Sequence, residues 1–223
     1  MGVLYFVKHA QASLDAPSGD LSPLGWQQGR RLGASMSASR VDPAIVATGT
    51  LDRHRQTVAA MTDDQPVDVL EDEGWNDLDH ASVLARHEPV FGDAEPTRAE
   101  FQEWTEQAWL RWASGAHDHE YAETFGDFAR RVARAKLGLV SRLAPDATAV
   151  VVTCGGPIAW VSAALWAGWG PEQDARPWAS AWSRMNSVVV NTSVTKVALA
   201  PRGLSLVSFN DHSHLERVER TFR

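Results

Sequence analysis

Short apolar runs alternate with longer amphipathic segments along most of this chain, and this alternation restricts the fold more than any other feature of the sequence. Runs typical of strands occupy residues 3–7, 45–48, 67–70, 149–153, 187–190, 194–198 and 204–209. Strand and helix patterns that alternate in this way are typical of a layered α/β domain. They predict a three-layer α/β sandwich with a mostly parallel central sheet.

Helical signals fill the intervals between these runs. Ser22 is a good N-cap in front of Pro23, and the pair predicts a helix that continues to about residue 37. Apolar residues recur at helical spacing in other intervals. These patterns predict a helix that begins near Arg53 and further helices over residues 98–114, 123–143 and 157–166.

Length and composition bound the class of protein. A chain of 223 residues suits a single α/β domain spanning residues 1–223. Its formal net charge of −7 argues against nucleic-acid binding, which needs a basic face. With one cysteine the chain can form no internal disulfide, and its first apolar run is too short for a signal peptide or a membrane span. We therefore expect a cytoplasmic protein with no nucleic-acid or membrane partner.

Charged and nucleophilic residues follow several of the predicted strands. The first strand ends at Lys8 and His9, and strand ends are where an open α/β sheet presents its chemistry. Arg53 lies at a helix start, Asp77 in a short polar segment, and Cys154 directly after the strand at 149–153. A histidine beside a strand is more often structural. His9 is accompanied by Lys8, Arg53, Asp77 and Cys154, however, and this group of residues favours a functional site over a structural role.

Several segments carry a family resemblance in a fixed order. Residues 8–13 read Lys-His-Ala-Gln-Ala-Ser, which is similar to the Arg-His-Gly-Gln-Ala-Ser motif of the histidine phosphatase superfamily. The other segments that are similar to motifs of this family are residues 21–28, 53–57, 76–80, 123–132, 153–156, 191–194 and 209–215. Together they cover nearly the whole chain, so the sequence resembles this superfamily and its phosphoglycerate mutase-like fold.

The resemblance implies a role for each candidate residue. His9 matches the nucleophile that becomes phosphorylated, and Asp77 falls where the acid lies, with Glu73 as its substitute. Lys8 and Arg53 match positions that bind the phosphoryl oxygens. Residues 80–122 do not fit the alternating pattern and lie where relatives build a cap, so we expect a lid insertion there.

Three departures from the family motifs bear on activity. Lys8 replaces an arginine and keeps the charge without the planar fork that grips two oxygens. Ala10 replaces a glycine, which would strain the backbone if φ were positive. Cys154 replaces the second motif histidine, and a thiol is a poor donor without charge. Losing one such donor typically costs about 10² to 10³ in rate, so restoring a histidine at 154 is expected to raise turnover.

The expected function is phosphomonoester hydrolysis or phosphoryl transfer through a phosphohistidine on His9, weakened by Cys154. The partner is a small phosphorylated molecule or phosphate itself, and no cofactor is expected. The alternative is a catalytically inactive relative that binds phosphorylated ligands through Lys8, Arg53 and the Cys154 position. A third reading makes Cys154 the nucleophile, but no Cys-x5-Arg phosphate loop follows it.

Two further features have a structural and a functional reading. His80, His212 and His214 lie beside aspartates, but the family motifs account for them, so no metal site is expected. The ten tryptophans are many for this length. Core packing explains most of them, and a self-association face that forms a homo-oligomer stays open as the alternative.

Overall fold

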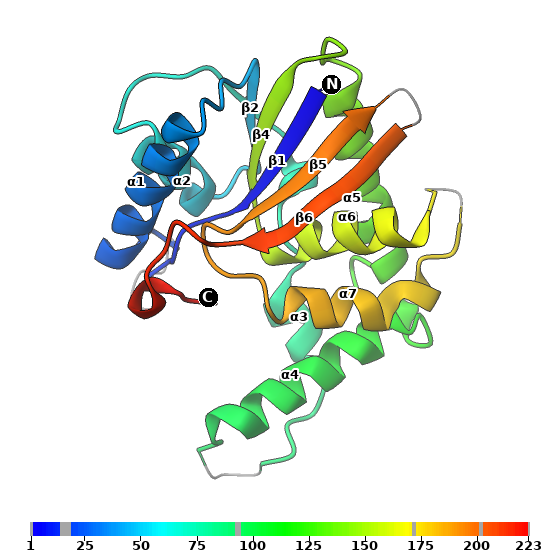
Figure 1. The fold of residues 1–223 in the computed structure, drawn as a ribbon. Coiled ribbons are helices and arrows are strands. Elements are labelled where there is room, and N and C mark those ends of the chain that lie inside the picture. Colours follow the sequence, from blue (N-terminus) through cyan, green and yellow to red (C-terminus); the bar gives the residue numbers. More distant parts are fainter. Residues whose placement is uncertain (1, 14–18, 92–94, 171–172, 201–202, 223) are drawn as a thin grey trace.

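The central feature of the structure, a computed structural model, is a six-stranded sheet in the order β3-β2-β4-β1-β5-β6 (Figure 1). The structure describes residues 2–222 except 14–18, 92–94, 171–172 and 201–202. Strands β1 to β4 run parallel to one another, and β5 and β6 are antiparallel to their neighbours. The strands are β1 (Gly2–Lys8), β2 (Ile45–Thr48), β3 (Val69–Glu71), β4 (Thr148–Thr153), β5 (Val194–Ala200) and β6 (Gly203–Asp211).

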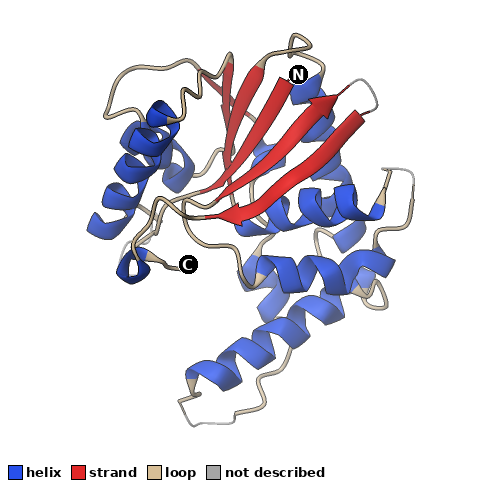
Figure 2. Cartoon of the chain, in the orientation of Figure 1, coloured by secondary structure: helices blue, strands red, loops and turns tan. Residues whose placement is uncertain are grey.

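Helices cover both faces of this sheet (Figure 2). Helices α1 and α2 lie on one face, and α5 and α6 lie on the other, with α7 packed beside α6. The described helices are α1 (Pro23–Ala38), α2 (Asp52–Met61), α3 (His80–Leu84), α4 (Arg98–Ala113), α5 (Phe125–Val140), α6 (Gly155–Ala167) and α7 (Ala179–Asn186). The predicted three-layer α/β sandwich with a mostly parallel sheet is confirmed.

Strand β1 shows why the first apolar run has no polar alternation. Leu4 and Phe6 belong to the core on the α5 and α6 side, whereas Tyr5 and Val7 belong to the core on the α1 and α2 side. A parallel strand covered on both faces buries every side chain, so its sequence reads as continuously apolar. The same arrangement sets the end of β1, and with it His9, in the middle of the sheet.

Local signals account for the helix starts. Ser22 caps α1, and its side chain accepts a hydrogen bond from Gly25 N at 3.0 Å, as the sequence predicts. Thr124 caps α5 and forms a capping box with Asp127. Helix α6 begins at Gly155, two residues before the predicted start, because Cys154 already occupies the N-cap position.

The predicted strand at 187–190 is wrong. This segment follows α7 and forms no sheet ladder in the described structure. The side chain of Asn210 bonds its backbone instead, since Oδ1 accepts from Val190 N at 2.9 Å and Nδ2 donates to Val188 O at 2.8 Å. Its valines are apolar because Val189 and Val190 are buried in the core, which mimics a strand pattern.

The segment 80–122 contains α3 and α4, and residues 92–94 of it lie outside the described part. Helix α4 confirms the prediction over 98–114, ending one residue earlier. Its N-terminal half projects from the body of the molecule (Figure 1). Its C-terminal half joins the core, where Trp112 is 1% exposed and contacts Phe125 and Trp182 edge-on or tilted at centroid distances of 5.3 and 5.6 Å. The segment 80–122 is therefore anchored to the core through the C-terminal half of α4.

Candidate active site

The C-terminal edge of the parallel strands brings the candidate residues together. Lys8 ends β1, and His9 follows it; Arg53 stands in the first turn of α2, and Cys154 joins β4 to α6. Arg53 Nη2 lies 3.4 Å from Cys154 Sγ. The charge of Asp77 acts on both Arg53 and Cys154. The structure thus places all five predicted site residues in one cluster.

His9 is held with one ring nitrogen free. Its backbone N donates to Thr153 O at 2.8 Å, and its carbonyl accepts from Asn191 Nδ2 at 2.9 Å. Nδ1 lies 2.7 Å from Ala10 O, so Nδ1 carries the proton and donates it, which leaves the Nε2 lone pair available. Burial, reinforced by the charge of Arg53, lowers the pKa of His9 well below its usual value. The ring is therefore neutral at pH 7.

Ala10 carries no backbone strain. It is fully buried and is not among the described residues with a positive φ. Its N–H donates to Thr57 Oγ1 at 2.9 Å, and that hydroxyl donates to Arg53 O at 2.6 Å. The replacement of a glycine at this position is thus tolerated, and the strand end is tied to the helix that carries Arg53.

Lys8 is bound on its far side by backbone carbonyls. Its Nζ donates to Val189 O at 2.9 Å and to Phe222 O at 2.7 Å. Burial lowers its pKa to about 8, so the ammonium remains mostly charged at pH 7. An ammonium has three N–H groups, and these two bonds leave one for an anion. Lys8 therefore contributes its positive charge to the site and at most one hydrogen bond to an oxygen of an anion.

Asp77 forms an ion pair with His80. His80 Nε2 lies 3.0 Å from Asp77 Oδ2, and Leu78 N donates to Oδ1 at 3.1 Å. Burial alone would raise the pKa of Asp77, but His80 and Arg53 hold it down at about 2, and Asp77 in turn raises the pKa of His80 against the effect of burial. The proton of this pair therefore belongs to His80 and not to Asp77. Glu73, the predicted substitute, is exposed.

Cys154 is a fully buried thiol, and burial raises its pKa to about 12. His54 lies against it, with Nε2 at 3.1 Å from Sγ. No spacing signal in the sequence marks His54, a histidine between two arginines, as a site residue. Arg55 lies on the surface, where it pairs with Glu71 and Asp52.

Among the described residues, no group of three or more histidine, cysteine, aspartate or glutamate side chains could hold a metal ion. His212 Nδ1 bonds Asn210 O at 2.7 Å, and His214 Nε2 lies 3.2 Å from Thr192 Oγ1. Thr192 N in turn donates to Lys8 O at 2.9 Å. His214 therefore supports the end of β1 through Thr192.

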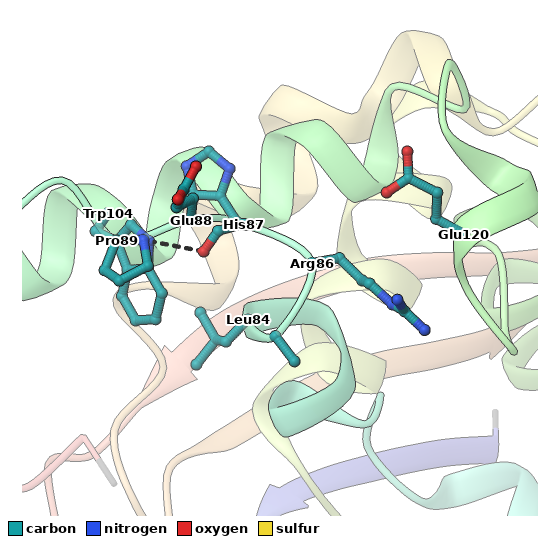
Figure 3. Close-up of a pocket in the computed structure, with 8 residues that line it drawn as sticks. Leu84, Arg86, His87, Glu88, Pro89, Trp104 and Glu120 are labelled. Atoms are coloured by element: carbon teal, nitrogen blue, oxygen red, sulfur yellow. Dashed lines mark hydrogen bonds between the residues drawn. The ribbon is translucent and has the colours of Figure 1, made fainter.

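A separate hollow of about 520 Å³ lies within the insertion (Figure 3). Trp104 Nε1 donates to His87 O at 3.2 Å across one side of it. None of the residues predicted for the catalytic centre lines this hollow, whose walls are Leu84, Ala85, Arg86, His87, Glu88, Pro89, Trp104 and Glu120.

No described helix has both the length and the apolar character needed to cross a membrane.

The structure is thus a three-layer α/β domain in which a buried histidine, two cations and a thiol cluster at the C-terminal edge of the parallel strands. The model of the histidine phosphatase superfamily, branch 1, matches residues 4–212, so the chain belongs to this superfamily. A comparison with curated protein sequences gave no significant match.

Solved structures share the fold at low sequence identity. A phosphoserine phosphatase mutant from Entamoeba histolytica, crystallised with phosphoserine, has a TM-score of 0.67 at 17% identity, covering 97% of this chain and 100% of that one. YhfR of Bacillus stearothermophilus has a TM-score of 0.66 at 23% identity with the same coverage. A mycobacterial glucosyl-3-phosphoglycerate phosphatase has a TM-score of 0.60 at 20% identity, covering 93% of this chain and 98% of that one.

Proposed function

We propose that this protein hydrolyses phosphate monoesters through a phosphohistidine on His9. The observation that carries the proposal is the neutral His9 ring, whose Nδ1 is bonded to Ala10 O while Nε2 is free beside the Arg53 guanidinium. A nucleophile needs an available lone pair, and a phosphoryl group needs cations around its oxygens. The superfamily and the two similar structures of phosphatases support the same class of reaction.

In the first step, His9 Nε2 attacks phosphorus and forms a P–N bond while the bond to the leaving oxygen breaks. Arg53 and Lys8 neutralise the phosphoryl oxygens, and Cys154 stands beside them as a weak donor. In the second step, water attacks phosphorus, the P–N bond breaks, and phosphate and neutral His9 are released. No cofactor enters either step.

The leaving oxygen needs a proton, and we assign its delivery to Asp77 and His80 acting together. His80 carries the proton at neutral pH, and Asp77 orients the ring through the 3.0 Å contact. The His80 side chain is 40% exposed, against 12% for Asp77, so it is the member that faces incoming substrate. After transfer, the His80 ring takes the next proton from water in the second step.

The substrate in this proposal is a small phosphorylated molecule in the cytoplasm. The insertion at 80–122 acts as the lid in this proposal. It carries His80, the proposed proton donor, and Trp109, whose ring centroid lies 5.7 Å from that of His80. One of the two similar phosphatase structures holds phosphoserine, which is a small phosphorylated molecule. The leaving group would lie against these two rings.

A second candidate function is binding of phosphorylated ligands without turnover. It is favoured by Lys8, which spends two N–H groups on carbonyls, and by the neutral thiol at position 154. The first feature leaves fewer N–H groups for the phosphoryl oxygens, the second adds no positive charge beside them, and Arg53 stays in place. This alternative predicts anion binding with no covalent intermediate.

Trapping the intermediate separates the two functions. The purified protein is incubated with a 32P-labelled aryl phosphate, quenched in alkali and digested. We expect an alkali-stable, acid-labile label on the peptide that contains His9, and steady release of phosphate. Phosphate binding measured by calorimetry without label or release would establish the binding function instead.

The pH dependence tests the proton donor. The pKa of His80 is raised above its usual 6.5, so its acid form persists to a higher pH than in a free histidine. This acid form is lost as the pH rises through the raised pKa. Turnover of an alkyl phosphate should therefore fall on the alkaline side. No fall is expected between pH 7 and pH 5, because the lowered pKa of His9 keeps the nucleophile neutral.

The control for this dependence is His80→Asn. It should lower alkyl phosphate turnover by about 10²-fold, while an aryl phosphate, whose leaving group needs little protonation, is much less affected. Deprotonation of Lys8, whose pKa is about 8, lowers turnover of both substrates at alkaline pH, so the ratio of alkyl to aryl turnover isolates the proton donor. A ratio with the same size and pH dependence in this variant as in the unmodified protein would rule out His80 as the donor.

A further inference from the structure

His54 is a buried histidine in the centre of the site to which the proposed steps give no task. It follows Arg53 on α2 and is fully buried. Its ring centroid lies 5.8 Å from that of His9, and its Nε2 lies 3.1 Å from Cys154 Sγ. A polar ring is costly to bury without a function or a full set of partners.

The surroundings of His54 leave its ring one position. A Cβ on Gly49 would lie 2.5 Å from Nδ1 and 2.7 Å from Cε1, so the absence of a side chain at Gly49 is what admits the ring. On the opposite edge stands the small side chain of Cys154. The imidazole is therefore packed between Gly49 and the sulfur, and Nε2 points at Sγ.

The hydrogen-bonding capacity of these groups indicates where the protons lie. Burial lowers the pKa of His54 to about 3 and raises that of Cys154 to about 12, so both are neutral at pH 7. The backbone of Gly49 lies near the His54 ring and interacts with it, but His54 Nδ1 has no hydrogen-bond partner with acceptable geometry among the described residues. A buried N–H without an acceptor is less favourable than a buried lone pair, so the ring proton belongs on Nε2, from which it donates to sulfur.

The sulfur then accepts from two sides. His54 Nε2 donates at 3.1 Å and Arg53 Nη2 donates at 3.4 Å. A thiol has two lone pairs and one hydrogen. With both lone pairs engaged, the hydrogen of the thiol is left for a third partner, on the side of the site where Arg53 and His9 would hold an anion.

We propose that His54 is a positioning residue for phosphoryl transfer, which holds the Cys154 sulfur against Arg53 so that the thiol hydrogen is donated to a phosphoryl oxygen. This inference rests on the proposed function. No proton is transferred in this arrangement, and His54 stays neutral throughout. A donor fixed in advance inside a closed site stabilises developing charge more than a freely rotating one, so the pair of His54 and Cys154 does part of what a charged donor would do.

A pair of matched variants tests the role of the ring nitrogen. His54→Gln keeps an N–H near the place of Nε2, and His54→Leu fills the space without one. We expect His54→Leu to lower kcat for an aryl phosphate by about tenfold with little change in KM, and His54→Gln to stay within about threefold of the unmodified protein. Equal kcat for the Leu variant, or an equal loss in both variants with retained thermal stability, would overturn the proposal.

Infrared spectroscopy gives a readout that needs neither turnover nor a variant. Cys154 is the only cysteine in the chain, so the S–H stretching band belongs to it alone. Adding inorganic phosphate to the unmodified protein should move this band to lower frequency, because the thiol then donates to an oxyanion. His54→Leu should weaken that response.

The outcomes of this measurement are distinct. If calorimetry shows phosphate binding and the band does not move, the inference about His54 is wrong while the proposed function stands. If phosphate does not bind at all, the proposed function fails and the inference fails with it. If removal of the ring moves the band to higher frequency without phosphate, the thiol donates to His54 instead, and the proposed direction is overturned.

Discussion

His9→Ala is expected to abolish phosphate-monoester hydrolysis and the covalent label together. The imidazole of His9 combines a free Nε2 lone pair with a place at the end of β1 near Arg53, and an alanine can form no P–N bond. The rate should fall by roughly 10⁴-fold or more, to the background level, as for loss of a nucleophile in other covalent enzymes. Steady-state phosphate release and the trapping assay measure this loss.

The control for His9→Ala is Cys154→Ala. Under the phosphohistidine mechanism the thiol is a weak donor, so its removal should leave activity within about tenfold. Phosphate affinity measured by calorimetry should persist in both variants, because Arg53 and Lys8 remain. Loss of all activity in Cys154→Ala together with retained activity in His9→Ala would make the cysteine the nucleophile.

Moving the imidazole from position 54 to position 154 is expected to give the largest gain in rate. By sequence alone, Cys154→His restores a missing donor. In the structure, however, His54 Nε2 already lies 3.1 Å from Sγ, so a second ring has no room. The single variant should lose about 1–3 kcal/mol of stability through overpacking. The double variant Cys154→His with His54→Ala removes the clash and should raise kcat by about 10²-fold.

Thermal unfolding and kcat for all four members of this cycle measure the effect. Each single variant should be slower or less stable than the unmodified protein, and the double variant should be faster. The effects of the two substitutions on kcat are then not additive, because the two side chains compete for one space. A Cys154→His variant that is both stable and fast would show that the two side chains do not share one space. A stable double variant without gain would show that Lys8 limits the site instead.

Much of the fold follows from the order of local patterns. Chains whose strand and helix signals alternate have few ways to bury both faces of a sheet, so the three layers could be inferred before any contact was known. The helix start at Ser22 rests on side-chain capping, which sequence records directly, whereas the helix that carries Arg53 begins at Asp52 without a side-chain cap. The strand predicted at 187–190 failed because a buried irregular segment, bonded by the Asn210 side chain, has the same apolar composition as a strand.

The candidate residues of the site could be named from motifs, since His9, Arg53, Asp77 and Cys154 stand in recognisable ones. Their protonation states and hydrogen bonds became known only with the folded arrangement. The proton of the Asp77 pair lies on His80, Lys8 is bound to carbonyls of residues more than 180 positions away, and His54 faces the sulfur from another element. Protonation and hydrogen bonding depend on burial and on neighbours distant along the chain, and these exist only once the strands and helices have packed.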